Sequence, residues 1–353
     1  MPKRNIIVMG GSTGSFEAFK KIVGALPKDL DASIFIVWHM APDITGILPQ
    51  VLDGVGRMPA AEARDGERIE PGRIYVARPD HHILLEDNII RVTRGPKENR
   101  FRPAVDPLFR SAAYTYGRRV IGVVLSGALD DGTSGLWAVK QRGGIAIVQD
   151  PLDAEISSMP TNAIREVKVD HVVRVSEMAE LLTRLSQKEL APETEAEMNG
   201  ETDERLKIEI DIAAETNALE RGSMEWGELT PFTCPECNGV LSRIRDGERP
   251  RYRCHTGHAF SADSLLSALT ENIEDSLWSA IRGVDESIML LNHIGDHFAE
   301  GNQTKLAAKF FQKAAEASER NDIIRQAVFD HERLSTDGIE NSPDPSEAGS
   351  TPA

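Results

Sequence analysis

Runs of residues that are apolar at every position are the feature that most constrains how this chain can fold. Residues 34–38 and 120–125 read IFIVW and VIGVVL, without the alternation of a strand that has one wet face. A strand that is apolar on both faces has to be covered on both, as in parallel sheets sandwiched between helices. Amphipathic stretches such as FEAFKKIVGAL separate the runs, as crossover helices would. We therefore predict an α/β domain with a doubly wound, mostly parallel sheet over residues 1–187.

One part of this segment breaks the alternation of strands and helices. The runs RIYVA, HILLE and IIRVT follow one another with only short turns between them. Asp87-Asn88, between the last two runs, suits a two-residue hairpin turn because both residue types tolerate positive φ. We predict an antiparallel hairpin inserted into the α/β domain.

The charge of the chain is concentrated in one segment. The formal net charge is −16, and residues 188–230 alone hold 13 acidic and four basic side chains. Such a segment is typical of a solvated acidic linker, and it argues against nucleic acid as the principal ligand. Within it, Leu206, Ile208, Ile210 and Ile212 alternate with polar residues, which indicates one short strand.

The apolar runs are too short for a membrane protein. None approaches the roughly 20 residues that span a bilayer. The N-terminus begins with basic residues, but the roughly five apolar residues that follow run straight into glycines, unlike a secretory signal. We therefore expect a cytoplasmic protein without membrane insertion.

The C-terminal part of the chain, residues 263–334, repeats apolar residues every three or four positions. This spacing predicts two amphipathic helices that form a hairpin. The apolar positions are Leu266, Leu269, Ile273, Leu277, Ile281, Val284, Ile288 and Leu291 in the first helix and Leu306, Phe310, Ala314, Ala317, Ile324 and Val328 in the second. Such stripes predict packing against another helix, in a second copy or a partner protein, or against the chain's own domains. Residues 335–353 are rich in Ser, Pro, Asp, Glu and Gly, and we expect a disordered tail.

All three cysteines of the chain lie in one short region. Cys234 and Cys237 form a CxxC pair, and Cys254 and His258 form a CxxxH pair. Together they supply four ligands for tetrahedral zinc, which predicts a ribbon-like zinc module over residues 231–262. His255 is an alternative fourth ligand, but its place next to Cys254 strains the chelate. Four protein ligands leave no open position for water, so we expect a structural zinc.

The segment Gly10-Gly11-Ser12-Thr13-Gly14-Ser15 follows a strand and opens a helix. One interpretation is a dinucleotide-binding turn, but the glycines lack the GxGxxG spacing, and the next strand ends in Trp-His-Met where a ribose-binding carboxylate is wanted. The other is a nucleophile turn, in which small neighbours let Ser12 protrude at the carboxyl end of the sheet. We favour the second interpretation, which predicts acyl transfer.

A serine nucleophile needs a base, and the base needs a carboxylate that orients it. His39 follows the second predicted strand, and Asp130 and Asp131 follow the strand at 120–125. The carboxyl ends of neighbouring parallel strands meet above one crevice. We therefore expect His39 to lie near Ser12, with one of the two aspartates beside it.

Six segments, in this order, resemble the protein-glutamate methylesterase domain of bacterial chemotaxis, the CheB family. They are GGSTGS, VWHM, GRIYVARPDHHILL, RPAVDPLFRSAA, VVLSGALDDGTSGLWAVKQRGG and SSMPTNAI, within residues 5–187. The resemblance implies that Ser12, His39 and Asp131 are a catalytic triad. It implies hydrolysis of glutamyl methyl esters on a methylated chemoreceptor or related signalling protein, with release of methanol and no catalytic cofactor. Some members of the family also deamidate glutamine.

The mechanism of such an enzyme needs amides that hold the oxyanion of the tetrahedral intermediate. Those of Thr13 and of Gly127 or Ala128 are the candidates, since they flank Ser12 and follow the strand at 120–125. The matching segments begin close to Met1, so we expect no receiver domain in this chain.

The chain departs from the family pattern at two places near the site. Ser15 stands where a second glycine is usual, and Ala128-Leu129 replaces the usual Met-Gly. These changes leave open a second function, a catalytically weak signalling scaffold that docks partners through its domains. A third possibility is an esterase or amidase for small molecules.

Asp106, directly before Pro107, lies in another of the matching segments. An aspartate at the N-cap followed by a proline is a common way to start a helix. We expect Asp106 to cap a helix there.

Overall fold

The computed structural model describes residues 3–40, 47–190, 200–214, 227–246, 249–332, 334 and 339. The chain divides into two compact units, Met1–Leu265 and Leu266–Ala353. Each unit is described by itself. The boundaries of the five predicted segments, from residues 1–187 to the tail at 335–353, stay predictions.

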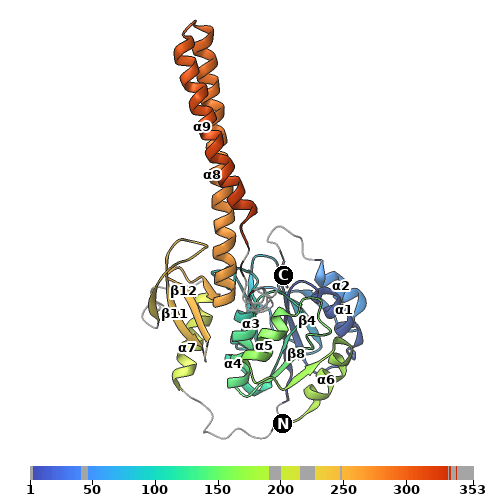
Figure 1. Ribbon diagram of the computed structural model, residues 1–353. Helices are drawn as coiled ribbons and strands as arrows, with labels where there is room; N and C mark the ends of the chain where they lie inside the picture. The colour runs from blue at the N-terminus through green and yellow to red at the C-terminus, as the bar shows by residue number, and fades with distance from the viewer. Residues whose placement is uncertain are drawn as a thin grey trace, which may run out of the picture. The chain divides into compact units, whose positions relative to one another are not determined.

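The first unit is built on a seven-stranded sheet of order β3-β4-β2-β1-β7-β8-β9, in which every pair is parallel (Figure 1). The strands are β1 Ile6–Gly11, β2 Ser33–Trp38, β3 Ala60–Glu62, β4 Arg73–Val76, β7 Val120–Val124, β8 Ile145–Gln149 and β9 His171–Val173. The predicted parallel α/β sheet is therefore confirmed.

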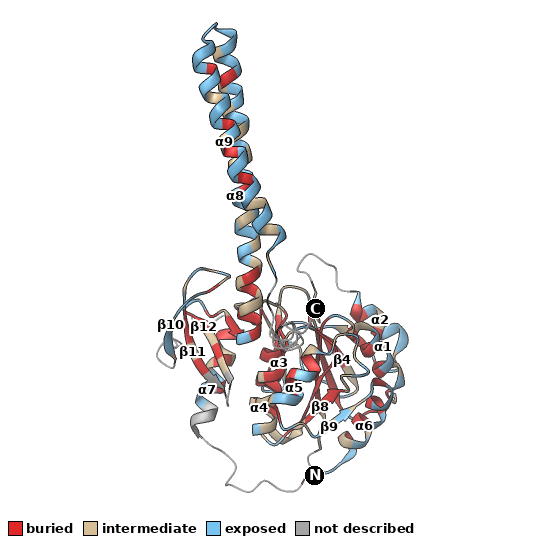
Figure 2. Ribbon diagram, viewed as in Figure 1, coloured by how far each residue is buried: buried red, intermediate tan, exposed pale blue. Residues whose placement is uncertain are grey.

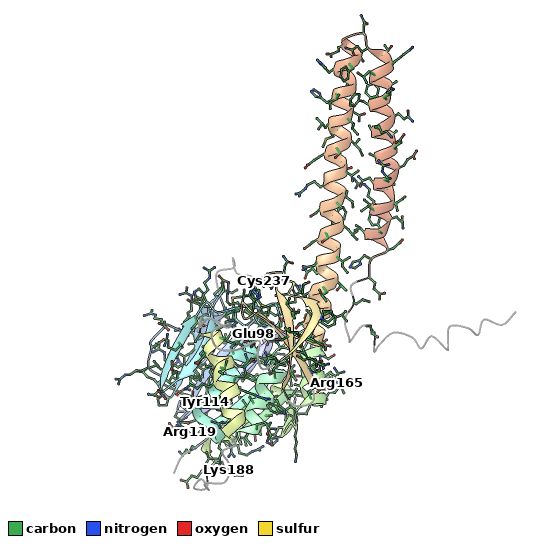
Figure 3. All side chains as sticks on the ribbon, turned by 90° about the vertical axis from the view of Figure 1, so that its left-hand side faces the viewer. Glu98, Tyr114, Arg119, Arg165, Lys188 and Cys237 are labelled. Atoms are coloured by element: carbon green, nitrogen blue, oxygen red, sulfur yellow. The ribbon has the colours of Figure 1, made fainter. Side chains whose placement is uncertain are left out.

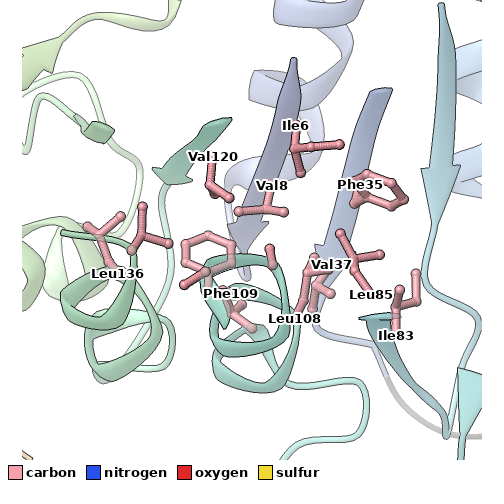
Figure 4. Close-up of a cluster of buried hydrophobic side chains, with 14 of the residues drawn as sticks. Ile6, Val8, Phe35, Val37, Ile83, Leu85, Leu108, Phe109, Val120 and Leu136 are labelled. Carbon is pink, nitrogen blue, oxygen red and sulfur yellow. The ribbon is translucent and has the colours of Figure 1, made fainter. Parts of the chain in front are cut away.

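Helices cover both faces of this sheet. They are α1 Ser15–Ala25, α2 Leu48–Val55, α3 Val105–Tyr116, α4 Thr133–Gln141, α5 Ser158–Glu166 and α6 Val175–Gln187, with a 3-10 turn at Gly117–Arg119. Successive residues of β1 point to opposite faces: Ile6 and Val8 pack with α3, α4 and α5, whereas Ile7 and Met9 pack with α1, α2 and α6. Figure 4 shows the first of these clusters, and Figure 2 shows that the inner strands of the sheet are buried. This two-sided packing is the doubly wound arrangement that the apolar runs predicted.

The predicted hairpin is also present. Strands β5 His82–Glu86 and β6 Ile89–Thr93 pair antiparallel as a separate two-stranded sheet. Asp87 and Asn88 form the turn with φ of 40° and 68°, the left-handed region that these residue types tolerate. The preceding run, RIYVA, instead supplies β4 of the main sheet.

Helix α7, Gly200–Ala213, occupies the segment for which we predicted a strand, so that prediction is wrong. Leu206 and Ile212 are buried, Ile208 and Ile210 are half-buried, and Glu209 between them is also buried. The most buried positions, Leu206, Glu209 and Ile212, have the spacing of a helix, but one of them is charged. The apolar residues taken alone therefore alternate with a period of two, which is typical of a strand.

The cysteine region forms a four-stranded antiparallel sheet of order β10-β11-β12-β13. Its strands are β10 Glu228–Thr233, β11 Val240–Asp246, β12 Arg249–Cys254 and β13 Ala259–Ser261. We call residues 228–261 the Cys3His module. The module belongs to the same compact unit as the α/β sheet.

The second unit consists of the C-terminal helices, which confirms the predicted helix pair. Helix α8 spans Ala262–Glu300 and begins in the first unit, and α9 spans Thr304–Phe329. Small residues of α9, such as Ala314 and Ala317, are buried between the two helices, and Phe298 stacks on Phe310.

Several large apolar residues of the helix pair are exposed, among them Met289, Leu290, Ile323 and Phe329. The expected association of this pair with another helix stays a prediction. Within the described residues, no helix is long and apolar enough to cross a membrane. Most of the predicted tail at 335–353 lies outside the described residues.

Candidate functional site

Ser12 lies in the tight connection between the end of β1 and the start of α1. Gly14 enters the helix with φ of 81°, which favours glycine. The Ser12 amide donates to the Ser126 carbonyl at 2.9 Å, and the Ser12 carbonyl accepts from Ser15 Oγ at 2.5 Å and from Trp38 Nε1 at 3.1 Å. The serine that replaces the usual glycine at position 15 thus adds a hydrogen bond that fixes the backbone of Ser12.

His39 lies beside Ser12 because their strands are neighbours. The register of β1 and β2 pairs Gly11 with Trp38, and the His39 amide donates to the Gly11 carbonyl at 3.1 Å. Ser12 and His39 directly follow this last pair, so they lie side by side at the carboxyl edge of the sheet. Strand β7 pairs with β1 on its other side, which brings Asp131 to the same edge.

The His39 ring pairs with Asp131. Nε2 of His39 lies 2.7 Å from Oδ2 of Asp131, and both side chains are 2% exposed. Burial by itself raises the pKa of Asp131, but the hydrogen bonds from His39, Val105 N and Asn99 and the charge of His39 outweigh it and hold the pKa below its ordinary value. An ionised Asp131 only accepts hydrogen bonds, so Nε2 carries the proton.

The other ring nitrogen, Nδ1 of His39, is free to act as a base. It is buried and has no hydrogen-bond partner among the described residues. No hydrogen bond joins it to Ser12 Oγ in the described part of the chain, and catalytic contacts of this kind often close only when substrate is bound.

The neighbouring carboxylate, Asp130, has a different partner. Its Oδ1 accepts a hydrogen bond from Ser261 Oγ at 2.6 Å. Of the two aspartates that the sequence offered as orienting groups, the structure places Asp131 against His39 and Asp130 against strand β13.

A short turn of residues 98–101 contacts the histidine–aspartate pair, and the sequence did not identify it. Asn99 Nδ2 donates to Asp131 Oδ1 at 3.0 Å. The Phe101 ring stacks on His39, with centroids 3.8 Å apart and an angle of 9° between the planes. The signal in the sequence is weak, since an asparagine in a loop indicates only a tolerance for positive φ.

Asp106 is a second buried carboxylate beside Asp131. It is the second residue of α3, whose N-cap is Ala104, so the predicted capping role is wrong. Its Oδ1 accepts from Gly135 N at 2.6 Å and its Oδ2 from Asn99 Nδ2 at 3.0 Å. Burial, followed by the charge of Asp131, raises the pKa of Asp106 to about 7.

The candidate oxyanion donors are not equivalent. The Gly127 amide donates to the Ile156 carbonyl at 3.0 Å, whereas none of the described residues accepts from the amides of Thr13 or Ala128. Thr13 and Ala128 are also exposed, so a substrate can reach them. Of the three candidates, these two amides have no acceptor among the described residues.

Leu129 adopts φ of 63°, a left-handed conformation that glycine occupies without strain. This is the position at which the family pattern usually has glycine. The Leu129 carbonyl accepts from Asn162 Nδ2 at 3.0 Å, which helps to hold the loop in that conformation. The altered loop therefore keeps a glycine-like backbone at a cost of roughly 1–2 kcal/mol.

A cavity of about 400 Å³ lies in the first unit, lined by residues that include Asn99, Asp106 and Arg251. Neither Ser12 nor His39 lines it. The cavity is therefore separate from Ser12 and His39.

The structure brings Cys234, Cys237, Cys254 and His258 together in the Cys3His module, with one ligand atom of each within 4.8 Å of the others. Nδ1 of His258 lies 3.7 Å from Cys234 Sγ and 3.6 Å from Cys254 Sγ, and Cys237 Sγ lies 3.7 Å from Cys254 Sγ. Figure 3 labels Cys237. A tetrahedron with bonds of about 2.3 Å has edges of about 3.7 Å, so the four groups fit a metal ion of that size. His255 is exposed and is not part of the group.

Comparisons with known proteins cover the α/β part of the chain. A family model described as CheB methylesterase matches residues 7–182. A Leptospira interrogans protein, a putative protein-glutamate methylesterase/protein-glutamine glutaminase, is 40% identical over 185 residues, which are 52% of this chain and 96% of that protein. A Pyrococcus abyssi protein-glutamate methylesterase/protein-glutamine glutaminase is 36% identical over 188 residues, 52% of this chain and 51% of that protein.

A solved structure is similar as well. The crystal structure of the Thermotoga maritima CheB methylesterase catalytic domain aligns with a TM-score of 0.50 and 34% identity, over 51% of this chain and 98% of that chain. The family model ends at residue 182, before the Cys3His module and the helix pair.

Proposed function

The chain belongs to the CheB methylesterase family, and on this premise we propose that it is a protein-glutamate methylesterase whose catalytic residues are Ser12, His39 and Asp131. The observation that carries the proposal is the buried contact of 2.7 Å between His39 and Asp131, beside a serine at the end of the neighbouring strand. It supplies a nucleophile, a base with one free nitrogen, and a carboxylate that fixes the tautomer of the base.

The reaction begins when His39 Nδ1 accepts the proton of Ser12 Oγ, which attacks the carbonyl carbon of a glutamyl methyl ester. The amides of Thr13 and Ala128 hold the oxyanion, and Asp131 stabilises the imidazolium. The bond to the methoxy group then breaks, and His39 returns the proton to the leaving methanol. Water attacks the acyl-Ser12 ester by the same route and releases the glutamate carboxylate and free Ser12.

The substrate of this site is a glutamyl methyl ester on a chemoreceptor or related signalling protein. The names of the relatives support this class of substrate, and they also support deamidation of glutamine, in which ammonia replaces methanol as the leaving group. The same residues serve both reactions because each begins with attack on a side-chain carbonyl.

The metal that Cys234, Cys237, Cys254 and His258 would hold is a structural zinc. Three thiolates and one imidazole are ligands that zinc prefers, and four protein ligands leave no position for a catalytic water. When bound, the ion supplies a cross-link between strands, and the chemistry stays with Ser12. The protein acts in the cytoplasm, where such thiols remain reduced.

Methanol release tests this function against its two alternatives. We expect the full chain to release methanol from methylated chemoreceptor membranes and to turn over a small methyl ester, such as methyl butyrate, far more slowly. Comparable rates on both substrates would favour a small-molecule esterase. No release from several receptors and small esters would favour the scaffold, which the altered Ala128-Leu129 loop motivates.

A further inference from the structure

The turn of residues 98–101 is held in a conformation that it does not favour by itself. Glu98 and Phe101 exchange backbone hydrogen bonds of 3.2 and 2.9 Å, and Asn99 and Arg100 between them have φ of 49° and 77°. Asparagine tolerates this region, whereas it is unfavourable for arginine because the Cβ crowds the backbone. Strained residues of this kind persist only where their surroundings fix them.

Strand β13 of the Cys3His module forms part of these surroundings. The Asn99 amide donates to the Ala259 carbonyl at 2.8 Å, and Asn99 Oδ1 accepts from the Ser261 amide at 2.9 Å and from Ser264 Oγ at 3.1 Å. Each contact joins the turn to the chain that follows His258. The module therefore holds both the backbone and the side chain of Asn99.

These contacts also decide which way the Asn99 amide faces. The Ser261 amide is only a donor, so the oxygen of Asn99 has to point toward it. The NH2 group then points toward the carboxylates of Asp131 and Asp106, both 3.0 Å away. An ionised Asp131 only accepts hydrogen bonds, so the module and the carboxylate favour the same orientation of the Asn99 side chain.

A buried ion cluster fixes the module to the same turn. Glu98 lies in hydrogen-bond contact with Arg110 of α3 and, through its two oxygens, with Arg253 at 3.2 Å and Arg251 at 3.3 Å. Glu209 of α7 pairs with the same two arginines of β12. Burial raises the pKa of Glu98, but the charges of these arginines outweigh it and lower the pKa. Such charges are stable in the interior only while all the partners are present.

Two of the four metal-ligand residues lie at the connection between the two strands that make these contacts. Cys254 directly follows Arg253 on β12, and His258 directly precedes Ala259 on β13. The connection is closed by a hydrogen bond of 3.0 Å from the Cys254 amide to the His258 carbonyl. A metal bound to both residues fixes the geometry of β12 relative to β13, and with it the position of Asn99.

From this chain of contacts we propose that the Cys3His module positions the catalytic histidine–aspartate pair. Asn99 and Phe101 are the positioning residues: one orients the Asp131 carboxylate, and the other stacks on His39. Metal binding to the module therefore raises the turnover of the esterase site. This effect on turnover rests on the proposed function.

Hydrogen exchange tests the structural step without any assay of activity. We compare the purified zinc-loaded chain, the chain stripped with a chelator, and the stripped chain reloaded with zinc. The Asn99 amide is expected to exchange at least about tenfold faster without metal, because its acceptor is the Ala259 carbonyl. The amides of β7, Val120–Val124, serve as the internal control and are expected to keep their rates. Unchanged exchange at Asn99 after metal loss would overturn the proposal.

Steady-state kinetics on a glutamyl methyl ester test the catalytic step. Cys254→Ser is expected to lower kcat by about 10- to 100-fold, as small misplacements of catalytic groups do, with KM unchanged within about twofold. The matched control is His255→Ala, which changes the exposed neighbour outside the ligand group. Asn99→Ala, with zinc bound, is likewise expected to lower kcat while KM stays unchanged within about twofold.

The double variant Asn99→Ala, Cys254→Ser decides whether the two effects share one route. Equal kcat values for the double variant and the stronger single variant support the proposal, because the metal acts through Asn99. Multiplication of the two losses would contradict it. A wild type that turns over no ester would refute the proposed function, while the exchange measurement would still decide whether the module holds the turn.

Discussion

The α/β sheet and the Cys3His module belong to one compact unit but are stabilised by different forces. All six residues of β1 are buried, and they pack into apolar clusters on both faces of the sheet. In the module, five of the six residues of β10 are exposed, and the buried apolar side chains are few, such as Leu241, Ile244 and Phe260. Burial of apolar surface is enough for the first region, whereas we expect the second to depend on metal binding and on charged contacts.

The proposed catalytic site depends on both regions for its geometry. Ser12, His39 and Asp131 are placed by the strands of the α/β sheet. The turn at 98–101, which contacts His39 and Asp131, is held by the module. Substitutions on the sheet side of the site are therefore expected to remove reacting groups directly. Substitutions in the module are expected to displace His39 and Asp131 through the turn of residues 98–101.

Exchange of the carboxylate that orients His39 is expected to have a large effect on the sheet side. Asp131→Asn keeps the shape of the side chain but favours the wrong tautomer of His39, so kcat is expected to fall about 10⁴-fold. Asp130→Asn weakens the contact with Ser261 Oγ and leaves the carboxylate beside His39 in place, so it is expected to cost about tenfold or less. Methanol release by the two variants measures the contrast, and similar losses would show that the assignment of Asp131 is wrong.

Metal loss is expected to open the module and leave the α/β sheet folded. Arg251 and Arg253 are 5% and 1% exposed, so trypsin can cut after them only when β12 leaves its place. We expect Cys254→Ser, or chelation of the wild type, to speed cleavage there at least about tenfold, because structural zinc contributes on the order of 10 kcal/mol to such modules. Trypsin is expected to cleave the His255→Ala variant at the wild-type rate. Protection that survives chelation would mean that the module folds without metal.

The pH dependence of the unfolding free energy tests the raised pKa of Asp106. The raised pKa of Asp106 means that the folded chain holds this proton more tightly than the unfolded chain. Protonated Asp106 makes its full contribution to the unfolding free energy below about pH 4, and this contribution is lost as the pH rises to about 7. Relative to Asp106→Ala, the unfolding free energy of the wild type is expected to fall over this range, by at most about 1.4 kcal/mol per pH unit. Urea unfolding at pH 5, 6, 7 and 8 measures it, and a difference that does not change with pH would contradict the account.

The smallest expected effect is at the altered loop of the sheet side. Leu129→Gly relieves a left-handed leucine, whereas Leu152→Gly, at an exposed leucine without positive φ, only adds flexibility to the unfolded chain. We expect Leu129→Gly to be the more stable variant by roughly 1 kcal/mol. Equal unfolding free energies would show that Leu129 is not strained.

The sequence predicted the parallel sheet, the inserted hairpin, the helix pair and the metal-ligand group, because each leaves a local pattern. Runs apolar on both faces, a spacing of three or four, and clustered cysteines can all be recognised within a few dozen residues. The proximity of Ser12 and His39 followed from one rule about the ends of parallel strands.

The contacts that the sequence did not predict join residues far apart in the chain. Glu98 and Glu209 look like surface charges, yet both are buried against arginines of β12. The acidic composition of residues 188–230 indicated a solvated linker and gave no sign that Glu209 turns inward. The role of Asn99 depends on hydrogen bonds to residues 131 and 261, and no spacing rule connects these positions.

The central claim is that Ser12 is the nucleophile of a protein-glutamate methylesterase. The most direct measurement is methanol release from methylated chemoreceptor membranes by the wild type, Ser12→Ala and Ser134→Ala. The control changes a serine of α4 that lines a cavity to which neither Ser12 nor His39 contributes. The account predicts a loss on the order of 10⁶ for Ser12→Ala and a rate within about twofold of the wild type for Ser134→Ala. Release by Ser12→Ala at a rate near that of the wild type would contradict it.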